Sequence, residues 1–132
     1  TIFCFVTDLG HITEKVSSYI EKANYLILEA NYDEEMLKGG HYPKFLKERI
    51  TSPLVHLSNK TTAKFLAEHI TEDLKYVWLC HLSGENNHPE LAYKTVEYEL
   101  RGVVVIPGVD VQVTALKRNS PSELYEFEIS EY

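Results

Sequence analysis

Residues 25–33 read YLILEANYD. An apolar run leads up to Glu29, and a polar stretch follows it, so this segment predicts a short buried strand that ends in a turn. Two other segments have the same form: residues 2–6 (IFCFV) are followed by Thr7 and Asp8, and residues 76–80 (YVWLC) are followed by His81. We therefore expect three buried strands, each ending at a polar residue.

Segments with helical spacing separate these strands. Ile12, Val16 and Ile20 recur at helical spacing after the first strand, and residues 63–70 carry apolar side chains on one face behind a cap at Ser58 or Asn59. A short helix capped by Asp33 and another beginning at Pro43 are expected between them. A longer helix should begin at Pro89 and close at Gly102. Strands that alternate with helices predict an α/β layered fold.

The last quarter of the chain changes its period. Apolar residues alternate with polar ones over 109–115 and again over 125–129. Alternation of this kind is typical of half-exposed strands. We expect a C-terminal β-hairpin joined around residues 117–122, and hence a mixed sheet.

Composition limits the class of protein. The chain has 132 residues, of which 44% are apolar and 25% charged, enough for one compact domain. A net charge of −7 disfavours nonspecific binding of nucleic acid, although a nucleic acid held by metal ions stays possible as a substrate. No secretory signal or membrane-length apolar run is evident. Cys4 and Cys80 resemble reduced core thiols, so a cytoplasmic location is the expectation. The chain opens at Thr1 directly before a strand, which suggests a cut through a larger fold.

Asp8, Glu29 and His81 are the first candidates for chemistry. Each lies at or directly after the carboxyl end of an expected strand, where ligands bind in open α/β sheets. Each also has an ordinary structural explanation. Asp8 can cap a helix, Glu29 can be a turn residue, and His81 can be a histidine hydrogen-bonded at a strand end. Position alone leaves both interpretations open.

His56 lies in the loop Pro53-Leu54-Val55-His56-Leu57-Ser58-Asn59, and the His-Leu-Ser of residues 56–58 recurs at 81–83. A histidine there could donate a proton or bind a metal. The alternative is a plain loop residue, with Ser58 or Asn59 serving as a helix cap.

The motifs in order carry a resemblance. They are VTDLG at 6–10, LILEANYDEEML at 26–37, HLSN at 56–59 and WLCHLS at 78–83 with Asn86-Asn87. Together they resemble the C-terminal half of a metallo-β-lactamase-fold hydrolase, and most closely the bacterial YycJ/WalJ type, a relative of ribonuclease Z. On this resemblance, residues 1–132 form half of an αββα sandwich whose N-terminal metal-binding half is absent.

The resemblance implies a site with two divalent metal ions, zinc or manganese. Asp8 matches the bridging aspartate and His81 the last metal-binding histidine of the family. Glu29 and His56 match the pair that helps protonate the leaving group. Ser58, Asn59 and Ser83 are expected to bind substrate. Two cations held in this way activate water and clamp a phosphodiester.

The chain also departs from the family pattern. The family's His-x-His-x-Asp-His loop is absent, since the closest histidines, His81 and His88, are seven residues apart. We therefore expect a phosphodiesterase or nuclease acting on DNA or RNA, inactive as this chain alone, without tightly bound metal and self-associating through an exposed half-core. The alternatives are a noncatalytic interaction module and a hydrolase of thioesters or lactones.

Overall fold

A computed structural model describes residues 1–7, 13–39, 56–117 and 120–127. These residues form a four-stranded sheet in the order β1 (Phe3–Val6), β2 (Tyr25–Glu29), β3 (Tyr76–Cys80) and β4 (Gln112–Ala115). All three neighbouring pairs are parallel. The three strands expected from the apolar runs are confirmed. Parallel pairing brings the carboxyl ends of the strands to one edge of the sheet, where Glu29 lies opposite Cys80.

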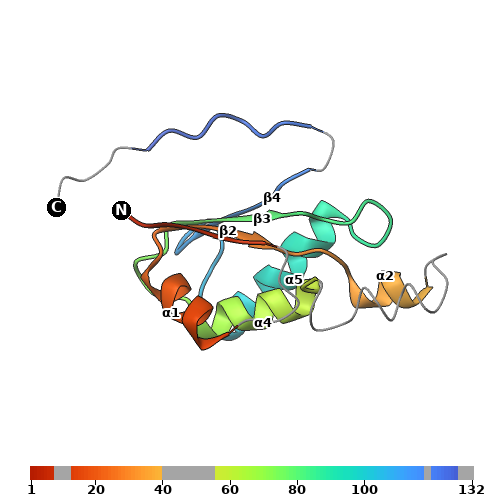
Figure 1. Cartoon of the computed structure of the whole chain (residues 1–132), viewed down its shortest axis with the longest axis horizontal. Helices are drawn as coiled ribbons and strands as arrows, with labels where there is room; N and C mark the ends of the chain where they lie inside the picture. The colour runs from red at the N-terminus through yellow and green to blue at the C-terminus, as the bar shows by residue number, and fades with distance from the viewer. Residues whose placement is uncertain (8–12, 40–55, 118–119, 128–132) are drawn as a thin grey trace.

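Helices α1 (Glu14–Lys22), α4 (Asn59–His69) and α5 (Pro89–Gly102) cover one face of this sheet, and α2 (Glu34–Gly39) lies beyond the strand ends (Figure 1). The α/β class is thus confirmed. None of the helices in the described segments has the length and apolar character needed to cross a membrane. The helix expected after Pro43 lies outside the described residues.

The two faces of the sheet differ in character. One face carries aliphatic side chains that pack in a single core with helix residues, namely Leu26, Leu28, Val77 and Leu79 against Ile20, Ala63, Leu66, Val96 and Leu100. The other face carries aromatic rings, with Tyr25 stacked on Phe3, Tyr76 and Trp78. This alternation follows from the two-residue period of a strand.

The expected C-terminal hairpin and mixed sheet are absent from the described part of the chain. The first expected strand is present as β4, but it runs parallel to β3, and residues 120–127 pair with no strand. Tyr125 and Phe127 instead pack on the aromatic face, against Tyr76 and Trp78. The segment crosses the sheet on the side away from the helices (Figure 1). Alternate residues of a segment lying across a sheet point toward it, which produces the same sequence pattern as a strand. Ile129 lies outside the described residues.

Helix ends follow the predicted caps with one exception. The side chain of Ser58 caps α4 by accepting from Thr61 N at 3.1 Å, and Asp33 accepts from Met36 N at 3.0 Å. Helix α5 begins at Pro89 and ends at Gly102, as expected. The left-handed residue after α5, however, is Val104 with φ 62°. Its N–H donates to the Arg101 carbonyl at 3.0 Å, and the N–H of the next residue, Val105, donates to the Leu100 carbonyl at 2.9 Å. A β-branched residue occupies the position that glycine usually takes.

Val104→Gly should therefore raise the free energy of unfolding by about 1 kcal/mol, because glycine removes the steric cost of a left-handed φ. The Val104 side chain is 82% exposed, so little packing is lost. Urea denaturation of both chains measures the change. Val109→Gly is the matched control, because Val109 is 78% exposed and is not among the positive-φ residues. Val109→Gly should lower the free energy of unfolding. A lower free energy of unfolding in both variants would contradict the argument.

Candidate active site

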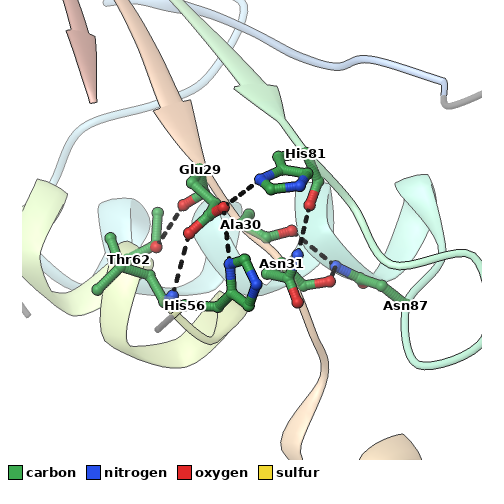
Figure 2. Close-up of polar contacts among 8 residues, drawn as sticks. Glu29, Ala30, Asn31, His56, Thr62, His81 and Asn87 are labelled. Carbon is green, nitrogen blue, oxygen red and sulfur yellow. Dashed lines mark hydrogen bonds and ion pairs between the residues drawn. The ribbon is translucent and has the colours of Figure 1, made fainter. Parts of the chain in front are cut away.

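Glu29 ends β2, and its carboxylate is completely buried. Its Oε1 contacts the Nδ1 atoms of His56, at 3.2 Å, and of His81. Its Oε2 accepts a hydrogen bond from Leu57 N at 3.2 Å, and its carbonyl accepts one from the Thr62 hydroxyl at 2.7 Å. Figure 2 shows both rings turned toward this one side chain. Glu29 and His81, both expected at the carboxyl ends of strands, thus meet at the sheet edge, and His56 joins them.

The buried carboxylate determines which ring nitrogens are protonated. An ionised carboxylate only accepts hydrogen bonds, so each histidine donates its Nδ1–H to Glu29. The Nε2 atom of each neutral ring then keeps a lone pair. The rings lie edge to face with centroids 5.2 Å apart, and the side chains are 25% exposed at His56 and 48% at His81. Both rings can therefore present Nε2 to a ligand or a substrate.

Glu29, His56 and His81 form a possible metal-binding group. Each offers one ligand atom, and these atoms lie within 4.8 Å of one another. A carboxylate with two imidazoles is a donor set that suits zinc and related divalent ions. A carboxylate that receives the other ring N–H of a ligating histidine is also common around metals. The residues present thus fit a divalent metal ion. Asp8, the other expected ligand, lies outside the described residues.

The three predicted substrate-binding residues lie close to this group, but the fold uses their side chains. Ser58 is buried and its hydroxyl contacts Glu34 Oε1 at 3.1 Å in addition to capping α4. Asn59 is buried in a reciprocal amide pair with Asn87, with both distances 2.8 Å. Ser83 is half-buried, and its hydroxyl accepts from Asn86 N at 3.1 Å. Their role toward substrate stays a prediction.

Two asparagines that we did not single out as site residues hold the loops around the site together. The side chain of Asn31 donates to the His81 carbonyl at 2.8 Å. The side chain of Asn87 donates to the carbonyls of Ala30 and Asn31 at 2.8 and 3.1 Å. Both asparagines occur in the motifs that carry the resemblance. The three carbonyls that they bind belong to the main chain, and no sequence spacing identifies such partners.

Among the described residues outside this cluster, two groups have shifted pKa values. Burial raises the pKa of the Tyr32 phenol, the Glu34 carboxylate raises it further, and a hydrogen bond with Ser58 lowers it. Burial also raises the pKa of the Cys4 thiol. Both groups stay neutral near pH 7. Cys4 and Cys80 are not joined by a disulfide bond, and both are half-buried rather than in the core where they were expected.

The chain is homologous to bacterial exodeoxyribonucleases of the WalJ/YycJ type, which confirms the predicted resemblance. Exodeoxyribonuclease WalJ of Streptococcus pneumoniae (serotype 2, strain D39) is 36% identical over 124 residues, which cover 94% of this chain and 46% of that protein. Exodeoxyribonuclease YycJ of Bacillus anthracis is 39% identical over 95 residues, which cover 72% of this chain and 36% of that protein. No protein-family model matches the chain. The chain spans about half the length of the curated relatives it matches, or less.

We expect this chain alone to bind zinc weakly. A metal ion at the Nδ1 atoms of His56 and His81 would have to replace both hydrogen bonds to Glu29, and a metal ion at Nε2 would meet fewer than the three protein ligands of typical catalytic sites. Calorimetric titration with zinc measures the affinity. Tight, stoichiometric binding by the monomer would show that Glu29 and the two histidines act as direct ligands. Glu29→Gln, which loses the charge but keeps the shape, would then abolish that binding.

Proposed function

We propose that this chain is the C-terminal half of a metal-dependent exodeoxyribonuclease with the metallo-β-lactamase fold. One observation carries the proposal: the buried Glu29 carboxylate contacts Nδ1 of His56 and of His81 at the carboxyl edge of a parallel sheet. The relatives named exodeoxyribonucleases support DNA as the substrate. Their greater length supports a second half that completes the site.

In the complete protein, His81 and Asp8 would hold divalent metal ions, zinc or manganese. His81 suits this role because its Nδ1–H is directed at Glu29, which leaves Nε2 for a metal. Bound divalent cations supply two things to such a reaction, an activated water and neutralisation of the phosphate charge.

His56 is the proposed acid for the leaving group. Its Nδ1–H donates to Glu29, so the proton that the ring gives up as an acid is the one on Nε2. As the phosphorus–oxygen bond to the leaving sugar breaks, the electron pair goes to that oxygen, which takes the proton from His56 Nε2. The oxygen that attacks phosphorus comes from water and stays on the product phosphate, and the proton that this water releases passes to solvent. Glu29 orients the ring throughout.

DNA contacts beyond the metal ions are assigned to the loop after β3. Ser83 is half-buried there, whereas Ser58 and Asn59 are buried in contacts of the fold. We therefore place Ser83 against the substrate, with Ser58 and Asn59 supporting the loop that carries His56. The net charge of −7 favours a substrate bound through metal ions over one bound by a basic surface.

In the complete protein, His56→Ala should lower turnover on DNA by about 10²–10⁴-fold with bound metal unchanged, because a general acid is lost. Asp8→Ala or His81→Ala should remove metal and activity together. Exonuclease assays and elemental analysis of the same preparations measure both quantities.

An activated aryl phosphodiester separates the acid role from a structural one. Its leaving group needs no proton, so the His56→Ala protein should cleave it almost normally. His69→Ala is the matched control. The His69 ring also contacts a carboxylate, with its Nδ1 2.8 Å from Glu21 Oε1, but this pair lies outside the site. Loss of metal in the His56 variant, or an equal loss of rate on both substrates, would show that His56 is not the acid.

The isolated chain should self-associate through the aromatic face of β1. Phe3 and Phe5 are 50% and 68% exposed there, and exposed apolar strands favour association. Sedimentation velocity should show species that grow with concentration, and Phe5→Glu should shift them toward monomer. Tyr98→Glu, an exposed aromatic position on α5, is the control and should change little. A monomer at all concentrations would refute this expectation.

A further inference from the structure

Asn31 makes two hydrogen bonds to the loop after β3. Its side-chain amide donates to the His81 carbonyl at 2.8 Å, and its main-chain carbonyl accepts from Ser83 N at 2.7 Å. The two contacts lie on either side of Leu82, the first at His81 and the second at Ser83, and Figure 2 shows the first of them. Asn31 therefore holds the carbonyl of His81 and the amide of Ser83 in place.

His81, whose carbonyl Asn31 binds, has an unusual backbone conformation. His81 has φ 56°, in the left-handed region. A side-chain-bearing residue adopts this region at a cost, even though histidine is found there more often than most. The strand ends one residue earlier, at Cys80, so sheet pairing does not impose the conformation. Contacts made by the loop must compensate for the cost.

Hydrogen bonds to its own main chain hold Asn31 in position. Its main-chain N–H donates to the Leu57 carbonyl at 2.9 Å, and its carbonyl also accepts from the Asn87 side chain at 3.1 Å. Asn87 is in turn paired with Asn59 at the start of α4. The segments that carry Glu29, His56 and His81 are thus joined through residue 31, and its amide group has a fixed direction.

We propose that Asn31 is a positioning residue, which holds His81 in its left-handed conformation and so directs His81 Nδ1 to Glu29. Without the amide, the loop can relax to a negative φ, and the ring leaves the carboxylate. The catalytic consequence rests on the proposed function, because only a metal-ligating His81 requires a fixed Nε2. The structural part stands on the contacts alone.

The test is the protonation of the His81 ring in Asn31→Ala and Asn31→Leu, the second of which restores most of the lost volume. Long-range ¹H–¹⁵N correlation spectra of histidine rings distinguish Nδ1–H from Nε2–H. The unaltered chain should show His81 as Nδ1–H. Both variants should shift His81 toward Nε2–H, the tautomer that free histidine favours in water, while His56 stays Nδ1–H because Asn31 does not contact its ring.

Asn24→Ala is the matched control. The Asn24 side chain also donates to a main-chain carbonyl, that of Asp73 at 3.0 Å, and accepts from Ile2 N at 2.8 Å, at the opposite end of the sheet. Its loss should leave the His81 ring unchanged. An unchanged His81 tautomer in folded Asn31 variants overturns the proposal. If the variants do not fold, the spectrum of the unaltered chain still tests the proposal. His81 found as Nε2–H in that chain would overturn the proposal as well.

These outcomes are separable from those of the nuclease proposal. The ring spectra require neither metal nor DNA. A shifted His81 tautomer together with full activity of the His56→Ala protein would keep the positioning role of Asn31 and reject the proposed acid. An unchanged His81 tautomer together with the expected loss of activity in the His56→Ala protein would reject the positioning role of Asn31 and keep His56 as the acid.

Discussion

A carboxylate removed from water organises this end of the molecule. Burying an isolated charge is strongly unfavourable, so Glu29 requires donors on both oxygens. Two imidazoles and the Leu57 amide provide them, and they come from two separate segments of the chain, at residues 56–57 and at residue 81. Each donor therefore depends on the others. Loss of one would leave a partly unpaired buried charge, which explains why the loops after β2 and β3 and before α4 are tied together so closely.

The parallel sheet makes this convergence possible. Neighbouring parallel strands end at the same edge, and the register of β2 and β3 puts Glu29 beside Cys80. The next residue of the β3 segment, His81, then needs only a change of backbone direction to face the carboxylate. Its left-handed φ provides that change, and the Asn31 side chain donates a hydrogen bond to the His81 carbonyl in this conformation. Strand pairing sets the approach of the two segments, and side-chain hydrogen bonds to main-chain atoms set the final orientation.

Local patterns predicted a large part of this arrangement. The three apolar runs, the caps at Ser58 and Asp33 and the helix from Pro89 to Gly102 depend on neighbours within a few residues, and all are present. The expected hairpin failed because alternation reports only which side chains point toward a surface. Tyr125 and Phe127 meet the aromatic face of the sheet without pairing as a strand. Val104 likewise adopts a conformation that no local glycine signal predicts.

The sequence by itself determined the α/β class, the strands and the polar residues that end them, because hydrophobic periodicity and capping act over short stretches of chain. It also placed Glu29 and His81 at the same sheet edge, since both follow apolar runs. Only the tertiary structure decided that one carboxylate contacts both histidines, and that Asn31 and Asn87 hold the loops around it. These contacts join residues 27 to 57 positions apart, and the contacts of the two asparagines are made to main-chain atoms. Main-chain atoms are identical at every residue, so the sequence carries no mark of which of them will meet.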